Sequence, residues 1–391
     1  MNFDNMKNLL DNFVEMGIAP GNTISVYKDG KNVYKYSCGL SDIENKKPMV
    51  GDEMVYLWSC SKVTTVTAAL QLFEKGLFLL DDPLYEYIPE YKDLTVMEEN
   101  GEIVKAKNPI TIRNLFNMTA GIRFGSNLES AKEASRLTNG KMDTDVMIRC
   151  TAKEPLYFHP GTKWLYTPCH DVLGGLVSIV TGKKFRDYVK ENIFDPLGMK
   201  NSVYHVTPEI KEKMAVQYVY EANEEITDVV DAQFGGSPKK GKFNLFEGNS
   251  YIMGEEYDSG GAGIISTVDD YVLLAAALAN YGLGTTGERI LAPQTVDLMR
   301  TNTLDEEKRK VFAQAQLRGY GYGLGVRTMI DKAAGGSLGS IGEFGWGGAA
   351  GASVYIDPKT NLAAVYAKHC LAPREDYYQP RVRNVLYSCL D

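Results

Sequence analysis

The chain has 391 residues, of which 44% are hydrophobic and 24% are charged, and these fractions exclude an intrinsically disordered protein. Its 50 acidic and 42 basic side chains leave a net charge of −8, which argues against a nucleic-acid partner because phosphate binding needs clustered Lys and Arg. No apolar run approaches the roughly 18 residues of a membrane span, so we expect no membrane partner.

Residues 1–17 are predicted to form an amphipathic first helix, and their composition indicates in which cellular compartment the protein is found. They are acidic and lack the basic start and apolar stretch of a signal peptide. The six cysteines of the chain have no C-x-x-C spacing and no regular framework. We therefore expect free thiols and a cytoplasmic location.

The remaining elements follow in a characteristic order. A β-hairpin signal surrounds 29–30, and a helix is expected over 59–74 because apolar residues recur there at helical spacing. The stretch 81–206 is mostly helical by period, whereas 207–258 is polar and rich in Tyr and Gly, and reads as loops or short strands. A helix is expected over 267–279, strands over 320–328, 352–356 and 362–367, and a last helix over 377–389.

This order indicates an α+β fold with an antiparallel sheet built from both ends of the chain and flanked by helices. We expect a discontinuous sheet domain over 1–80 and 259–391. The intervening 81–258 is expected to be a mainly helical inserted domain that also carries substrate-cleft loops. No internal repeat of about 20 to 50 residues interrupts this scheme.

Several motifs that resemble known sites fail in detail. The stretch 236–242 resembles a phosphate-binding loop, but Phe243 stands where a Mg-binding Ser or Thr belongs. The G-x-S-x-G pattern at 335–339 needs a strand before it and a helix after it, yet further glycines follow, so Ser337 is a poor candidate nucleophile. No metal site is predicted, because the four histidines show no paired spacing: His159, His170, His205 and His369.

A Ser-x-x-Lys pattern occurs three times, and its context separates the three copies. The copy at 25–28 lies on an expected strand, where residues three apart face opposite sides, and the copy at 237–240 lies in a Pro/Lys loop. Ser59 instead opens an expected helix, so Lys62 shares its face, and the helix N-terminus favours negative charge on the serine oxygen. On local sequence alone, an N-cap role for Ser59 is weighted equally with a nucleophilic one.

A serine nucleophile needs a base and a site for the oxyanion. A lysine keeps its proton at neutral pH unless its surroundings lower its pKa, so a nearby phenol can share the proton transfer. Tyr166, one of 24 tyrosines, is the candidate phenol. The glycine-rich 346–351 can bring the Ala349 N–H opposite the Ser59 N–H as an oxyanion hole, with each donor worth about 2.7–4 kcal/mol. The alternative for 346–351 is a tight contact between sheet and helix.

These elements together resemble the serine β-lactamase / penicillin-binding-protein superfamily, and most of all its branch with class C β-lactamases and family VIII carboxylesterases. The resemblance spans nearly the whole chain and includes PGNTISVYKDG, ITIRNLFNMTAGI, NIFDPLGMKNS, GGAGIISTVDDY and YGYGLGV. It implies a β-lactamase/transpeptidase-like fold. It also implies Ser59 as the acylated nucleophile, Lys62 as its partner, Tyr166 as general base and acid, and the Ser59 and Ala349 amides as the oxyanion hole.

Two departures separate the chain from class C β-lactamases. Pro168 stands where the Tyr-x-Asn motif of class C has its Asn, and Trp346 replaces the usual Lys or His of the third motif. Both changes favour a neutral ester or amide over a β-lactam antibiotic. We expect the substrate to contact Trp346, Pro168, Gly347, Gly348 and Arg123. Phe124 and the segment 207–258 are further expected linings of the cleft, and Cys60 and Cys169 are expected to be small buried residues.

The sequence thus predicts a serine hydrolase that forms an acyl-enzyme and acts like a carboxylesterase on small acyl esters, without a metal or organic cofactor. A β-lactamase or a D-Ala-D-Ala-type peptidase of the same fold is the nearest alternative. A non-catalytic relative that uses the cleft for binding or assembly is the alternative of another class. The oligomeric state does not follow from the sequence.

Overall fold

The computed structural model describes residues 1–123, 125–222, 240–371 and 374–390. Its centre is an eight-stranded antiparallel sheet with the order β10-β11-β12-β13-β14-β1-β2-β3. The strands are β1 (Gly21–Lys28), β2 (Lys31–Asp42), β3 (Lys47–Pro48), β10 (Tyr320–Tyr322), β11 (Arg327–Met329), β12 (Phe344–Gly345), β13 (Ser353–Asp357) and β14 (Leu362–Ala367).

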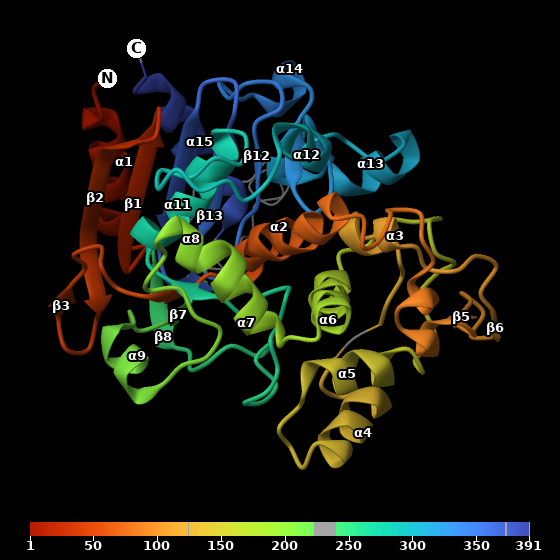
Figure 1. Cartoon of the computed structure of the whole chain (residues 1–391). Coiled ribbons are helices and arrows are strands. Elements are labelled where there is room, and N and C mark those ends of the chain that lie inside the picture. Colours follow the sequence, from red (N-terminus) through yellow and green to blue (C-terminus); the bar gives the residue numbers. More distant parts are fainter. Residues whose placement is uncertain (124, 223–239, 372–373, 391) are drawn as a thin grey trace.

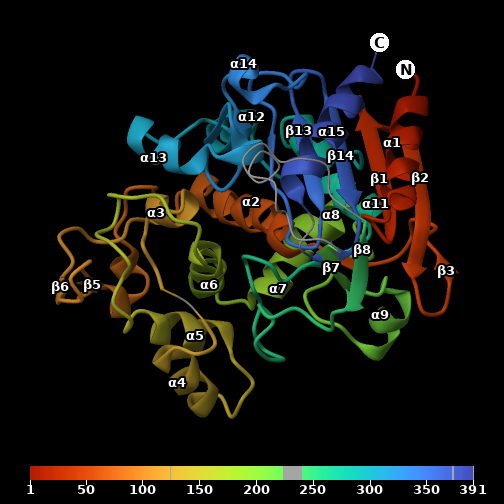
Figure 2. The same ribbon diagram turned by 180° about the vertical axis from the view of Figure 1, so that it is seen from behind.

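The sheet joins the two ends of the chain, as the sequence predicted. β1 pairs with β14 from Thr23 opposite Ala367 to Lys28 opposite Leu362. Figure 2 shows this as a red strand beside a blue one at the centre of the sheet. The α+β fold with an antiparallel sheet and flanking helices is therefore confirmed.

Helices cover both faces of the sheet. α1 (Asp4–Glu15) and α15 (Glu375–Ser388) lie on one face, and α2 (Ser61–Glu74) and α11 (Val268–Ala279) lie on the other (Figure 1). Alternate residues of β14 serve the two sides: positions 363, 365 and 367 join the apolar cluster of α2 and α11, and positions 362, 364 and 366 join that of α1 and α15. This follows from the period of two along a strand, and it makes β14 apolar throughout.

The helical part of the chain packs beside the sheet through α6 (Cys169–Thr181), which lies against α2. α6 also packs against α3 (Ile112–Phe116), α5 (Thr144–Thr151) and α7 (Phe185–Val189), and α4 (Glu129–Leu137) packs against α5. A three-stranded sheet of β7 (Tyr218–Ala222), β8 (Gly241–Leu245) and β15 (Cys370–Leu371) links the expected loop segment 207–258 to the C-terminal part. The division into 1–80 with 259–391 and 81–258 stays a prediction.

Shorter elements complete the described residues. The helices are α8 (Asp195–Leu197), α9 (Pro208–Lys213), α12 (Pro293–Met299), α13 (Glu306–Phe312) and α14 (Lys332–Gly335), and a π-helical turn η4 spans Lys190–Phe194. The 3-10 turns are η1 (Trp58–Cys60), η2 (Leu84–Glu86), η3 (Pro89–Tyr91) and η5 (Ala315–Leu317). The two remaining small sheets pair β4 (Val55–Tyr56) with β9 (Ile265–Ser266), and β5 (Thr95–Met97) with β6 (Ile103–Lys105).

The helix expected from residue 59 begins two residues later. Trp58–Cys60 forms the 3-10 turn η1, and α2 starts at Ser61. Trp58 has a φ of 47°, a left-handed conformation that an α-helix cannot include. Neither η1 nor α2, whose residues are all described, has a side-chain cap hydrogen bond, so the interpretation of Ser59 as a simple N-cap is wrong.

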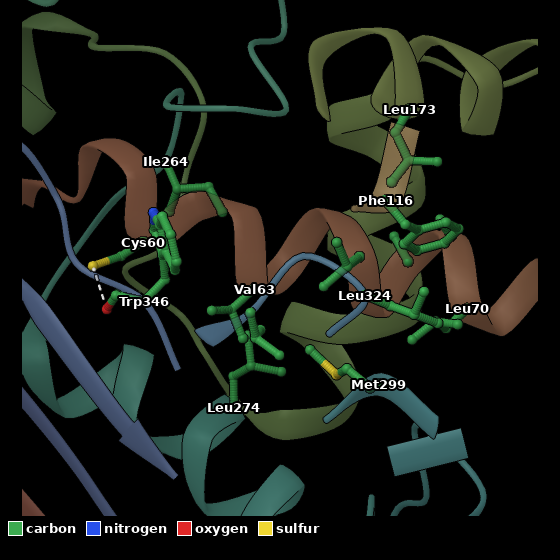
Figure 3. Packing of buried hydrophobic residues seen from close by; sticks show 14 of the residues in the cluster. Cys60, Val63, Leu70, Phe116, Leu173, Ile264, Leu274, Met299, Leu324 and Trp346 are labelled. Carbon is green, nitrogen blue, oxygen red and sulfur yellow. Dashed lines mark hydrogen bonds between the residues drawn. The ribbon is translucent and has the colours of Figure 1, made fainter. Parts of the chain in front are cut away.

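α2 is the helix around which the larger apolar cluster is built. Figure 3 shows Val63 and Leu70 of α2 packed among residues from other parts of the chain, including α3, α6, α11 and α12. Burying each such side chain stabilises the fold by roughly 1.5–3 kcal/mol. The first turn of α2 is therefore held rigidly between sheet and helices, and side chains projecting from it are well positioned for chemistry. The other residues labelled in the figure are Cys60, Phe116, Leu173, Ile264, Leu274, Met299, Leu324 and Trp346.

Candidate active site

Ser59 and Lys62 lie side by side at the start of α2. The Lys62 Nζ donates hydrogen bonds to Ser59 Oγ at 3.2 Å and to the Gly261 carbonyl oxygen at 2.7 Å. Lys62 is only 4% exposed, so these two acceptors fix its head in a site with little water. The contact that the sequence predicts between the Ser59 alcohol and the Lys62 amine is present in the structure.

The turn that carries Ser59 is tied down from both sides. The Leu57 N–H donates to the Ile264 carbonyl at 2.9 Å, and the Trp58 Nε1–H donates to Gln217 Oε1 at 2.8 Å. These bonds hold Trp58 at its positive φ, a conformation that costs a non-glycine residue about 1–3 kcal/mol. No local sequence pattern predicts this strained turn, because the residues that hold it in place come from distant parts of the chain.

Tyr166 closes the site over Lys62. The Lys62 Nζ lies 4.7 Å from the centroid of the Tyr166 ring. The Trp346 Nε1–H donates to the Tyr166 phenol oxygen at 3.0 Å, and the two rings stack with centroids 5.6 Å apart. The structure thus brings Ser59, Lys62 and Tyr166 together, and it adds that Trp346 holds the phenol in place.

The glycine-rich segment after β12 runs against the turn of the serine. A Cβ on Gly348 would lie 2.2 Å from the Leu57 carbonyl oxygen, so only glycine allows this approach. The Cys60 Sγ contacts the Trp346 carbonyl oxygen at 3.6 Å (Figure 3). Ala349 lines the same cavity as Ser59, and its N–H has no backbone acceptor among the described residues. This geometry is compatible with the expected oxyanion hole.

Two cavities meet at Tyr166. The first, of about 300 Å³, is lined by Ser59, Trp164, Tyr166, Gln316, Leu317, Trp346, Gly347, Ala349, Glu375 and Gln379. The second, of about 430 Å³, is lined by Ile122, Gly125, Ser126, Tyr157, Leu165, Tyr166, Thr167, Pro168, Ser250, Tyr251 and Met253. The expected substrate contacts Trp346 and Gly347 line the first cavity, and Pro168 lines the second.

Other expected lining residues have different places. Arg123 stands behind the second cavity, with its guanidinium 4.9 Å from the centroid of Tyr157 in the cavity wall. Phe124 lies outside the described residues. The segment 207–258 contributes Ser250, Tyr251 and Met253 to the wall. Cys60 and Cys169 are fully buried, as expected.

Asp171 is a charged residue of the site that the sequence reasoning missed. It lies in α6 at 1% exposure and accepts hydrogen bonds from Ser259 Oγ at 2.7 Å and Tyr257 OH at 3.0 Å. A Cβ on Gly261 would lie 2.6 Å from Asp171 Oδ2 and 3.4 Å from Lys62 Nζ, so this glycine brings carboxyl and amine close together. Burial raises the pKa of Asp171, and the Ser259 hydrogen bond and the Lys62 charge oppose that rise. The sequence signal that could have identified Asp171 is a single acidic residue inside an otherwise apolar helix.

The rejected serine motifs lie in other surroundings. Ser25 is on β1 and accepts a hydrogen bond from Asn32 Nδ2 at 3.0 Å, and Lys28 pairs with Asp29. Ser337 follows the short helix α14 instead of a strand, and its Oγ accepts from the Gly339 N–H. Ser237 and most of 236–242 lie outside the described residues.

The four histidines serve separate hydrogen bonds. His159 contacts Glu98, His205 contacts Asp258, and His369 contacts the carbonyls of Val216 and Leu40. His170 donates from Nε2 to the Phe116 carbonyl, and burial lowers its pKa to about 3. Within the described parts of the chain, no three His, Cys, Asp or Glu side chains are grouped to hold a metal. No described helix is long and apolar enough to cross a bilayer.

Comparison with known proteins identifies the family. A family model described as Beta-lactamase matches residues 6–386. The chain belongs to the β-lactamase family. Membership of this family, together with esterase relatives, makes it a serine hydrolase, as the sequence predicted.

Relatives and solved structures of this family include esterases. Esterase EstB of Burkholderia gladioli is 28% identical over 349 residues, which cover 87% of this chain and 83% of that protein. EstCE1, described as a hydrolase with promiscuous acyltransferase activity, superposes with a TM-score of 0.76 at 23% identity and covers 98% of this chain and 97% of its own. A family VIII carboxylesterase gives a TM-score of 0.74 at 18% identity, covering 99% and 97%. The expected resemblance is therefore confirmed, and the two structures confirm the fold.

Proposed function

We propose that the chain is a serine acyl hydrolase that acts like a carboxylesterase on small esters through a covalent acyl-enzyme. The observation that carries this proposal is the Lys62 Nζ, which contacts Ser59 Oγ on one side and the face of Tyr166 on the other. An alcohol, an amine in contact with it and a phenol over that amine are the groups that nucleophilic acyl transfer needs. The position of Tyr166 beside both cavities allows it to reach the attacking and the leaving oxygen.

The reaction follows from these positions. Ser59 Oγ attacks the ester carbonyl carbon while the Tyr166 phenolate, stabilised by the Lys62 ammonium over its ring, accepts the serine proton and becomes a phenol. The Ser59 and Ala349 amides bind the oxyanion. When the tetrahedral intermediate collapses, the bond to the alcohol breaks and Tyr166 returns the proton to the departing oxygen. Water then attacks the acyl-enzyme in the same way and releases the acid.

An ester substrate is favoured over a β-lactam by two residues of the cavities. Trp346 brings an indole where class C enzymes have a cation, and Pro168 brings a ring where they have an amide. The rim is apolar as well, since Tyr157 and Tyr251 are 47% and 40% exposed beside the second cavity. EstB, an esterase relative at 28% identity, supports the same substrate class.

Labelling with an active-serine phosphonate tests the assignment. We expect one adduct on Ser59 by peptide mass analysis, and none in Ser59→Ala. Turnover of short p-nitrophenyl esters should exceed that of nitrocefin and D-Ala-D-Ala peptides. An adduct on Ser337 would reject Ser59 as the nucleophile. Nitrocefin turnover at a rate comparable to that of the esters would favour the β-lactamase alternative. The absence of both adduct and turnover would favour a non-catalytic binding role.

Acyl transfer to an alcohol is a second candidate, because the same acyl-enzyme can be attacked by an alcohol in place of water. The printed description of EstCE1 names both hydrolase and acyltransferase activity. Adding a small alcohol to an ester hydrolysis assay distinguishes the two fates. A new ester product formed at the expense of free acid would support acyl transfer. Unchanged product ratios would mean that the enzyme only hydrolyses the ester.

A cytoplasmic location also remains a proposal. Its support is the state of the six cysteines, all of which are free thiols in the structure. Free buried thiols are typical of a reducing compartment. Fractionation of cells that express the intact chain tests this, and recovery outside the cytoplasm would contradict it.

A further inference from the structure

The cavity that holds Ser59 has a carboxyl group in its wall. Glu375 lies in the first turn of α15, is half-buried, and its Oε2 accepts a hydrogen bond from Gln379 Nε2 at 2.9 Å. A Cβ on Gly347 would lie 2.4 Å from Gln379 Nε2 and 3.5 Å from Glu375 Oε2. The carboxyl therefore packs against the segment that presents Ala349. Among the described lining residues of this cavity, Glu375 is the one with a formal charge.

Aromatic rings form much of the remaining wall. Trp164, Tyr166 and Trp346 all line the cavity, and the Tyr166 and Trp346 rings stack on each other. Lys62 lies over the Tyr166 ring and Trp346 also stacks on Phe312, so these rings form an apolar wall around the Glu375 carboxyl. A carboxyl in an apolar wall is a group that recognises an ammonium ion. The chemistry of this wall thus matches a cation better than an anion or a purely apolar group.

The charges around Glu375 are compatible with a ligand cation. Lys368, whose Nζ lies 3.6 Å from the centroid of Tyr378, interacts electrostatically with Glu375, and burial lowers the pKa of Lys368 to about 7. Asp376, the next carboxyl, pairs with Arg374. Burial also raises the pKa of Glu375 to about 7, so a cation in the cavity would favour its charged form.

We propose that this cavity binds the ammonium group of a small cationic ester or amide, and that Glu375 selects for that charge. The inference rests on the proposed function, since it assigns the substrate class of the same site. The net charge of −8 on the whole chain also favours the approach of a cation. Either the acyl group or the alcohol can carry the ammonium, according to which of them enters the cavity.

Two pairs of substrates that differ in charge but hardly in shape test the proposal. On the acyl side, p-nitrophenyl β-alaninate is compared with p-nitrophenyl butyrate, each corrected for its rate of hydrolysis without enzyme. On the alcohol side, acetylcholine is compared with 3,3-dimethylbutyl acetate. We expect the ammonium member of at least one pair to have a kcat/KM about tenfold higher or more, a ratio equivalent to about 1.4 kcal/mol.

Two variants test whether the ratio of kcat/KM values between the charged and neutral substrates depends on the Glu375 carboxyl. Glu375→Gln keeps the shape and the bond to Gln379, and should bring the ratio of the selective pair close to one. Asp376→Asn makes the same chemical change one residue away and should retain the wild-type ratio. A wild-type ratio of one or less in both pairs, or a ratio that survives in Glu375→Gln, would overturn the proposal.

Calorimetry separates this inference from the proposed function. In Ser59→Ala, acetylcholine or β-alanine methyl ester should bind at least tenfold more tightly than its neutral analogue, whether or not the wild type turns over any ester. Absence of turnover and of a phosphonate adduct would reject the hydrolase proposal alone. Hydrolysis that depends on Ser59 but ignores charge, with no binding preference in Ser59→Ala, would reject this inference alone.

Discussion

Trp346 acts on Tyr166 in two ways, because its ring stacks on the phenol ring and its Nε1–H binds the phenol oxygen at 3.0 Å. Trp346→Phe keeps the stacking and removes the hydrogen bond. We expect kcat for a p-nitrophenyl ester to fall roughly threefold to tenfold, the effect of one net hydrogen bond. Steady-state kinetics on the purified variant measures this.

Trp164→Phe is the matched control for this experiment. Trp164 lines the same cavity, but its buried Nε1 has no hydrogen-bond partner among the described residues. The same substitution there removes no bond and should cost less activity. Equal losses in the two variants would mean that the Trp346 hydrogen bond does not position Tyr166.

At the scale of single residues, the reactive groups could be predicted from the sequence, but the residues that contact and position them could not. Ser59 and Lys62 stand three apart at an expected helix start, a local pattern that survives folding. Asp171 reaches Lys62 only because Gly261, far along the chain, lets the two approach. Glu375 enters the cavity only because α15 packs beside the segment of Gly347. Such neighbours depend on tertiary contacts that carry no local signal.

Among the elements, α11 shows how well a capped helix can be predicted. It was expected over 267–279 and spans Val268–Ala279, with the Thr267 side chain accepting a hydrogen bond from the Asp270 N–H at 3.1 Å. The turn at Trp58 shows the opposite case. Its left-handed conformation is held by the bond to Gln217, so the start of α2 was placed two residues too early.

The cap of α11 can be tested by two substitutions at one position. Thr267→Val is close to the wild type in shape but leaves the Asp270 N–H without its acceptor, so we expect the free energy of unfolding to fall by about 1 kcal/mol, within a range of about 0.5–2. Thr267→Ser keeps the acceptor and should lose less. Urea denaturation of both variants measures this, and a serine variant as unstable as the valine variant would show that packing outweighs the cap.

For the whole molecule, the order of patterns along the chain indicated the architecture. Strand signals at both ends and helical periods between them favoured one sheet made from both ends, and β1 does pair with β14. Cavity walls could not be predicted in this way, since the cavity of Ser59 combines residues from η1, η5, the segment after β12 and α15. The substrate class therefore depends on contacts that only the folded chain reveals.

Buried neutral histidines make the stability of the whole fold depend on pH. Burial lowers the pKa of His170 to about 3, whereas an unfolded histidine titrates near 6.5. Below pH 6.5 the unfolded chain therefore binds a proton that the folded chain excludes, and the contribution to the free energy of unfolding falls as the pH drops toward 3. The limit is about 1.4 kcal/mol per pH unit for one histidine.

Replacing His170 isolates its share of this dependence. His170→Gln keeps an amide N–H for the Phe116 carbonyl that His170 Nε2 contacts at 3.1 Å, and it cannot titrate. Although less stable at neutral pH, this variant should lose stability between pH 6 and 4.5 less steeply than the wild type, by about 1.4 kcal/mol per pH unit. Urea denaturation at several pH values measures the slopes, and identical slopes for His170→Gln and the wild type would mean that His170 is protonated inside the fold.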